Sequence, residues 1–187
     1  MSKEFKPVEL TRESQKEILD WCLEILRASL TGKAPPPGPK VEGEGGVFVT
    51  LKKNGELRGC IGVFSWDRPL RETIERMTLA AAFNDHRFPP LTLPELDNLE
   101  LTISVLTQPK PVANLQDIVI GRDGLYLLHP KSRGVLLPVV AEEYGFTPTQ
   151  FAEQTSMKAG LPPKAYLDPG AELLVFTAPA FSTADFS

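Results

Sequence analysis

The residues best able to do chemistry lie together in the hexapeptide LRGCIG at positions 57–62. Along a β-strand, Arg58, Cys60 and Gly62 share one face. A guanidinium beside a thiol lowers the pKa of the thiol and favours the thiolate. This pattern predicts a nucleophile or an anion-binding site, with Cys60 as the candidate catalytic residue and Arg58, Gly59 and Gly62 as candidate binding residues. The alternative is a cysteine buried in a tightly packed strand.

The two glycines of this stretch are unusual inside a strand. Glycine has no side chain to pack and lowers β propensity. Gly59 and Gly62 flank Cys60 with one residue between, which indicates that something approaches closely there. It can be another backbone segment, a β-bulge or a ligand.

A second candidate site is the segment NDHRF at 84–88, where a predicted helix runs into a proline-rich loop. Polar groups at such a junction often line clefts, so Asp85 and Arg87 are candidate binding residues. The alternatives are a structural ion pair and a contact that fixes the loop backbone. His86 has the chemistry of a general base for Cys60, but no spacing rule supports that pairing, and an exposed bystander is favoured.

Lys158 is a third candidate for anion binding, although a cation at a helix end is already explained by the helix dipole. His129 precedes a proline and is typical of a turn. Cys22 falls on the apolar stripe of a helix and reads as a small core residue. The cysteines and histidines are not spaced like metal ligands, so no metal site is predicted. The sequence identifies no cofactor.

Composition restricts the class of protein. The chain has 187 residues, a net charge of −4 and 42% apolar residues, with acidic and basic residues mixed. It can form a real core and gives no strong sign of binding duplex DNA. No phosphate-binding loop, dinucleotide fingerprint or nucleophile elbow is present. The first residues lack the apolar run of a signal peptide, and no stretch is long enough for a membrane span, which predicts a cytoplasmic protein with reduced thiols.

The elements that position these residues follow from periodicity. A helix capped by Thr11 is predicted to run to about residue 30, followed by a Pro/Gly-rich loop at 32–46. Next come a hairpin of strands 47–51 and 56–63 around an Asn-Gly turn, a helix at 69–84 and a strand at 99–106.

The second half repeats this order. Strands at 124–129 and 134–137 form a hairpin, helical segments follow at 139–144 and 148–159, and Gly160 caps the last of them. A strand at 173–177 completes the set. The prediction is an α+β fold with two lobes, built from duplicated hairpin–helix–strand units with mainly antiparallel sheets and an extra N-terminal helix.

Three segments carry a resemblance to a known family. They are VFVTLKKNGELRGCIG, AAAFNDHRFPPL with ELDNLELTISVL, and GVLLPVVAEEYGF followed by KAGLPPKAY. Together they resemble the AMMECR family, whose bacterial and archaeal members are called AmmeMemoRadiSam system protein A. The resemblance covers about residues 8–180, and LRGCIG is the hallmark of the family.

The resemblance implies a single AMMECR-type domain over residues 8–180 with a larger and a smaller lobe. It implies association with a Memo-type protein and a radical-SAM protein, and a suggested role in modifying a nucleic acid or another macromolecule. The family patterns map onto Leu57 to Gly62, onto Asp85, Arg87 and Phe88, and onto Lys158 to Leu161. A small-molecule or nucleic-acid ligand is compatible with the fold.

The chain departs from the family pattern at four positions. Val139 stands where relatives have glutamine, and Ser156 where a cysteine is common. Phe146 and Tyr166 replace tryptophans. A mechanism that needs a second thiol, or an amide at 139, is therefore not expected here.

Two functional hypotheses remain from the sequence. In the first, the chain is an enzyme or enzyme subunit in which Cys60 is the nucleophile or covalent carrier, Arg58 stabilises it, and Asp85 and Arg87 shape the pocket. In the second, the chain is a non-catalytic adaptor or ligand-binding module of the same system. Substrate and oligomeric state cannot be read from the sequence.

Overall fold

The structure is a computed structural model that describes residues 8–187, and the chain divides into two compact units. Unit 1 consists of residues 8–106 together with residues 179–187. Unit 2 consists of residues 107–178. Each unit has its own sheet and its own core and is described by itself. The predicted extent of a single domain, residues 8–180, stays a prediction.

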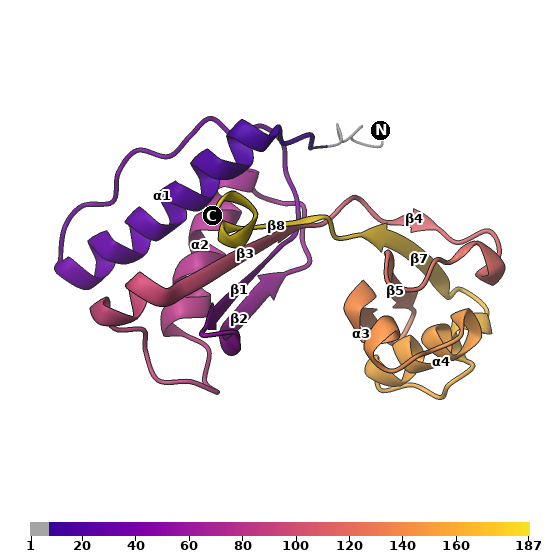
Figure 1. Cartoon of the computed structure of the whole chain (residues 1–187). Coiled ribbons are helices and arrows are strands. Elements are labelled where there is room, and N and C mark those ends of the chain that lie inside the picture. Colours follow the sequence, from indigo (N-terminus) through magenta and orange to yellow (C-terminus); the bar gives the residue numbers. More distant parts are fainter. Residues whose placement is uncertain (1–7) are drawn as a thin grey trace. The chain divides into compact units, whose positions relative to one another are not determined.

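Unit 1 is a four-stranded sheet in the order β2-β1-β3-β8, in which every neighbouring pair is antiparallel (Figure 1). Two helices cover one face of the sheet, and short 3-10 turns complete the unit. The elements are α1 (Arg12–Thr31), β1 (Val47–Lys53), β2 (Glu56–Val63), α2 (Leu70–Phe83), η1 (Leu93–Asn98), β3 (Leu99–Val105), β8 (Ala180–Ser182) and η4 (Thr183–Phe186).

The core of unit 1 lies between the helices and the sheet. The strands alternate between the two faces, so that Val47, Val49 and Leu51 of β1 are fully buried against the helices. The inner face of α2 includes Leu70 and Ile74, which are also fully buried. The opposite face of the sheet carries no helix of unit 1.

Unit 2 has a second antiparallel sheet, in the order β4-β7-β5-β6, covered by two helices. Its core is smaller and centres on Phe151, Leu125 and Ala152. The elements are β4 (Lys110–Pro111), η2 (Leu115–Asp117), β5 (Asp123–His129), β6 (Ser132–Leu136), α3 (Pro138–Glu143), α4 (Pro148–Lys158), η3 (Ala165–Leu167) and β7 (Glu172–Thr177).

The two units share one topology, which confirms the predicted α+β fold with repeated hairpin–helix–strand units. In each unit the first hairpin strand is central and pairs with the return strand on one side and with the later strand on the other. In each unit a glycine of the return strand lies directly beneath a helix. A Cβ on Gly59 would come closer than 3.0 Å to the carbonyl oxygen of Ala81 in α2, and a Cβ on Gly134 would lie 2.6 Å from that of Thr155 in α4.

Several local features depart from the prediction or extend it. The C-terminal segment returns to unit 1 as β8, a strand of only three residues that the sequence did not indicate. The Pro/Gly-rich stretch at 32–46 has no helix or strand and meets α1 where the Trp21 indole N–H donates to the Pro36 carbonyl at 3.2 Å. None of the helices in residues 8–187 is long and apolar enough to span a membrane.

The first testable prediction concerns Gly59. We expect Gly59→Ala to destabilise the chain by about 1–3 kcal/mol or more, because the new methyl group meets a main-chain oxygen of α2 that cannot move without shifting the helix. Urea unfolding monitored by circular dichroism measures this change in the free energy of unfolding.

The matched control for this prediction is Gly62→Ala on the same strand. A Cβ at Gly62 meets the Phe48 ring, which is a side chain and can rotate away. The Gly62 variant should therefore lose less stability than the Gly59 variant. The opposite ranking would contradict the close approach of α2 to β2.

Candidate functional site

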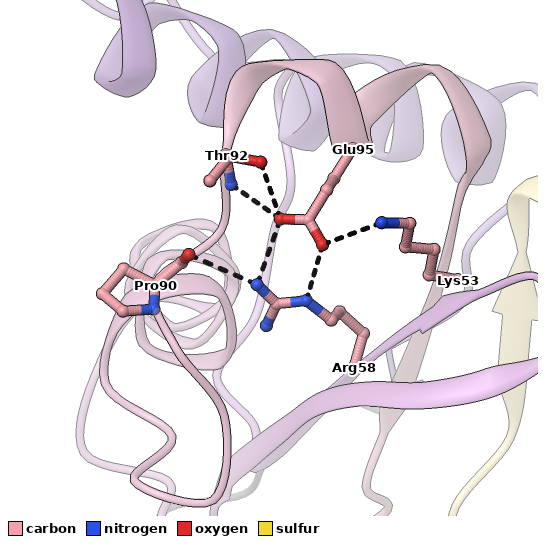
Figure 2. A network of polar contacts seen from close by, with 5 residues as sticks. All are labelled: Lys53, Arg58, Pro90, Thr92 and Glu95. Atoms are coloured by element: carbon pink, nitrogen blue, oxygen red, sulfur yellow. Dashed lines mark hydrogen bonds and ion pairs between the residues drawn. The ribbon is translucent and has the colours of Figure 1, made fainter.

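A β-bulge at Arg58 determines which way this side chain points. Leu51 of β1 pairs with Gly59 of β2, but the next residue, Lys52, pairs with Leu57, so the register skips Arg58. An extra residue of this kind breaks the alternation of side chains along the strand. The Arg58 guanidinium is consequently directed to η1, where Nε donates to Glu95 Oε1 at 2.9 Å and Nη2 donates to Oε2 at 3.1 Å (Figure 2).

Glu95 is the centre of this polar network. Its carboxylate also accepts hydrogen bonds from the Thr92 N–H and hydroxyl and from Lys53 Nζ, while the Pro90 carbonyl accepts from Arg58 Nη2 at 3.3 Å (Figure 2). The Arg58 and Glu95 side chains are only 11% and 14% exposed. The hydrogen bonds from Arg58, and then those from Thr92 and Lys53, hold the pKa of Glu95 well below its usual value.

The expectation that Arg58 projects beside Cys60 is therefore wrong. It rested on unbroken alternation from residue 58 to residue 62, and the bulge removes that alternation. Two of the guanidinium nitrogens are bound to Glu95, and the third, Nη1, is buried without a hydrogen-bond partner among the described residues. Arg58 thus connects η1 and the preceding loop to β2. It does not lie beside the Cys60 thiol.

Asp85 and Arg87 close the outer edge of β2 at Cys60. The Cys60 N–H donates to Asp85 Oδ2 at 2.9 Å, and Arg87 Nη2 donates to the Cys60 carbonyl at 3.2 Å. Arg87 is held in place by Asp85, with Nε to Oδ1 at 3.0 Å and Nη2 to Oδ2 at 2.7 Å. Because β2 is the last strand of its sheet, these two side chains supply the donor and the acceptor that a further strand would provide.

This arrangement agrees with the structural alternatives for Asp85 and Arg87, an ion pair that also fixes backbone. The Asp85 side chain is 5% exposed, whereas that of Arg87 is 58% exposed. The hydrogen bonds from the Arg87 guanidinium, followed by those from the Cys60 and Arg87 N–H groups, hold the pKa of Asp85 well below its usual value. A role for either residue in binding a ligand stays a prediction.

The Cys60 side chain lies on the face of the unit 1 sheet that carries no helix of that unit. Its Sγ lies 3.3 Å from Thr50 Oγ1, and the residue is partly exposed. The register places Cys60 beside Thr50, Thr50 beside Thr102, and Thr102 beside Ser182. These four residues, which we call the hydroxyl row, cross all the strands of the sheet and contain no charged group.

No general base accompanies the thiol among the described residues. His86 is exposed and forms no hydrogen bond with Cys60. The residue bonded to Sγ is Thr50, whose hydroxyl does not act as a base near neutral pH. The pairing of His86 with Cys60 is thus not supported, in line with the bystander interpretation.

Cys22 behaves as predicted, as a core residue. It is fully buried, and burial raises the pKa of its thiol to about 12. The Thr78 hydroxyl donates to its sulfur at 3.4 Å. A thiol in this environment is inert, so the two cysteines of the chain differ sharply in accessibility.

The remaining candidates lie in unit 2. Lys158 occupies the last turn of α4 and is exposed. His129 ends β5 and is almost buried, with Nε2 3.2 Å from Asp168 Oδ2 and Nδ1 accepting from the Lys131 N–H. Ser156 is fully buried and donates to the Ala152 carbonyl, which satisfies its hydroxyl. Across residues 8–187, no group of His, Cys, Asp or Glu side chains is arranged to hold a metal ion.

Sequence reasoning missed Glu95 and Thr50. A signal for Glu95 was present, because Thr92-Leu93-Pro94-Glu95 has the spacing of a capping box, and the Glu95 carboxylate accepts from the Thr92 N–H as in such a box. It did not indicate that Arg58 would reach the same carboxylate. Thr50 is adjacent to Cys60 only through strand register, which a hairpin with a bulge makes hard to assign from sequence.

Comparison with known proteins gives consistent matches over most of the chain. A model of the AMMECR1 family matches residues 19–181. A protein of Methanothermobacter thermautotrophicus is 41% identical over 165 residues, which cover 84% of this chain and 86% of the relative. Protein MK0488 of Methanopyrus kandleri is 39% identical over 181 residues, with coverage of 92% and 86%.

A solved structure shares the fold. The crystal structure of the uncharacterized protein PH0010 from Pyrococcus horikoshii aligns with a TM-score of 0.77 and 35% sequence identity, over 92% of this chain and 93% of that chain. None of these names states an activity.

The second testable prediction concerns Glu95→Gln. Loss of the carboxylate leaves the Arg58 charge buried without its partner, so we expect a loss of about 3 kcal/mol at neutral pH. Lys53→Gln is the matched control. Lys53 is 40% exposed, and its removal should cost less than about 1 kcal/mol. Urea unfolding measures both changes.

The same variant carries a prediction about pH. The folded-state pKa of Glu95 is lowered, so its stabilising contribution is complete above the unfolded-state value of about 4.3 and is lost as the pH falls toward the folded-state value. The stability of the parent chain should therefore fall more steeply below about pH 5 than that of the Gln variant. If the stabilities of the parent chain and the Gln variant fell equally steeply below about pH 5, the role given to Glu95 would be contradicted.

The third testable prediction concerns the thiols. Iodoacetamide applied to the native chain should alkylate Cys60 and leave Cys22 unmodified, because Cys60 is partly exposed and Cys22 is fully buried. Mass spectrometry of tryptic peptides measures the modification at each site, and unfolding in urea should make both reactive. Equal protection of the two residues in the native chain would show that the Cys60 sulfur is not accessible.

Proposed function

This chain belongs to the AMMECR1 family, and on that premise we propose that it is a non-catalytic, ligand-binding subunit. In this proposal it works with Memo-type and radical-SAM proteins in the modification of a nucleic acid or another macromolecule. The hydroxyl row is the surface that it offers to the bound partner or substrate. The reaction itself takes place on the partner proteins.

The observation that carries this proposal is that residues 58, 59 and 62 have structural roles, whereas the Cys60 side chain has none. The Arg58 side chain holds Glu95, Gly59 admits α2, Gly62 admits the Phe48 ring, and the Cys60 main chain is bound by Asp85 and Arg87. The Cys60 thiol takes no part in that packing. It lies in a row with the Thr50 and Thr102 hydroxyls, which are suited to hydrogen bonding with a ligand rather than to proton transfer. Ser182, at the end of the row, already donates to Glu100 and accepts from the Ala184 N–H.

The cellular setting of the proposal follows from the same chain. Two reduced cysteines, one of them partly exposed, suit the cytoplasm, where thiols are kept reduced. Work with two partner proteins also requires surfaces beyond a single ligand site, and the chain has two units with separate cores that can supply them.

A second candidate function is the Cys60-centred enzyme or enzyme subunit, and one observation favours it. The Cys60 residue is partly exposed, and the Arg87 guanidinium reaches the carbonyl of the same residue. A nearby cation stabilises a thiolate. In that case the thiol forms a covalent intermediate and a base comes from a bound partner or from the substrate.

The fourth testable prediction separates these two functions. Cys60→Ser replaces the thiol with a hydroxyl, which removes the nucleophile and keeps a hydrogen-bonding group at this position. If the chain is a binding subunit, the variant should still retain purified Memo-type and radical-SAM proteins in pulldown assays. It should also still complement a deletion strain. An enzyme that uses Cys60 should lose complementation as completely as the deletion does while still retaining its partners.

The surface itself is tested by Thr102→Arg, which places a charge in the middle of the hydroxyl row. We expect this variant to lose partner retention at least about tenfold, since a buried unpaired charge opposes binding. Glu17→Arg on the exposed side of α1 is the matched control and should have no effect. Full retention of both partners by a folded Thr102→Arg variant would contradict the proposed surface.

A further inference from the structure

The described chain has four sheet edges, and three of them are blunted. The strand β4 has two residues and β8 has three, which is too short to pair with another chain. The edge of β2 is closed at its middle by Asp85 and Arg87. The fourth edge is β6 in unit 2, a strand of five residues that pairs with β5 on one side only.

The register shows which groups of β6 face outward. His129 and Ser132 close a two-residue turn, so they form a hydrogen-bonded pair, and bonded and non-bonded pairs alternate from there. Arg133 and Val135 therefore fall in non-bonded pairs and turn their N–H and C=O groups away from β5. Counted from the glycine beneath the helix in each unit, Val135 corresponds to Cys60, whose outward groups are the ones bound by Asp85 and Arg87.

No side chain closes β6 as Asp85 and Arg87 close β2. In the described part of the chain, no side chain hydrogen-bonds with the outward main-chain groups of Arg133 or Val135. Unpaired groups repeated every second residue on a strand edge are what an added strand satisfies. The equivalent edge strand of unit 1, β2, has its outward groups bound by side chains, whereas β6 does not. We therefore regard β6 as the edge that can accept an added strand.

Cations gather around this edge. Arg133 lies on β6 itself, and Lys131 lies in the turn before it, and both are exposed. Lys158 belongs to the last turn of α4, which packs on β6, since the Ser132 hydroxyl donates to the carbonyl of the adjacent Ala159 at 2.7 Å. None of these three cations forms an ion pair with a described residue, and the nearby Asp168 is bound to His129.

We propose that the edge of β6 binds an extended, acidic segment of a partner protein as an additional β-strand. The outward groups of Arg133 and Val135 pair with its main chain, and the three cations attract its carboxylates. The proposal does not depend on the hydroxyl row and stands if the proposed function of that row fails.

The fifth testable prediction uses a fluorescein-labelled peptide of alternating Glu and Val as the probe, with binding followed by fluorescence anisotropy. Val135→Pro removes the outward N–H and leaves the bonds to β5 in place, because that N–H does not point to β5. We expect its affinity to be at least about fivefold lower than that of Val135→Ala, which keeps the N–H. Circular dichroism confirms that both variants are folded.

Two further measurements make the test specific. Arg133→Glu should weaken binding of the same peptide, and amide hydrogen exchange of the parent chain should slow at residues 133 and 135 when the peptide is present. Equal affinity of the Pro and Ala variants would overturn the proposal. Slower amide exchange at Gly62 of β2, and not at residues 133 and 135 of β6, would also overturn it. So would the absence of saturable binding up to about 1 mM peptide.

Discussion

The structure around Cys60 depends on how one sheet edge is closed. A terminal strand needs partners for its outward N–H and C=O groups, and β2 receives them from two side chains of the segment after α2 rather than from another strand. The same segment is fastened again a few residues later, where Glu95 and the Pro90 carbonyl bind Arg58. Two anchors on β2 thus fix the path of the chain from α2 to β3, and with it the surroundings of the thiol.

This constraint explains why chemically suggestive residues need not be catalytic. Arg58, Asp85 and Arg87 are the charged candidates of unit 1, and each is bound by main-chain or side-chain partners that stabilise the fold. The low pKa values of Asp85 and Glu95 report those hydrogen bonds and carry no sign of acid–base work near neutral pH. The Cys60 thiol stands apart, since nothing in the packing of unit 1 requires a sulfur atom there.

The sequence located the longer helices and strands but not the short strands β4 and β8 or the bulge in β2. Apolar periodicity located α1, α2 and the hairpins, and Cys22 was recognised as a core residue because one helical face fixes its environment. The position of the bulge was not predictable, because the Arg58 side chain that it redirects is bound by Glu95 and Pro90, which are distant in sequence. For the same reason the partner of Arg58 was misjudged. The glycines did signal a close approach, and that approach is by α2 and by Phe48.

Comparison of the two units separates what the fold requires from what it leaves free. Both return strands need a glycine beneath a helix, because in each the helix backbone approaches the strand too closely for a Cβ. The next residue of each strand turns its main chain outward, and there the units differ: Cys60 is enclosed by an ion pair, whereas Val135 is left unpaired. Since one topology tolerates both arrangements, neither is dictated by folding. Binding functions are therefore best sought at these two positions, the side chain at 60 and the main chain at 135.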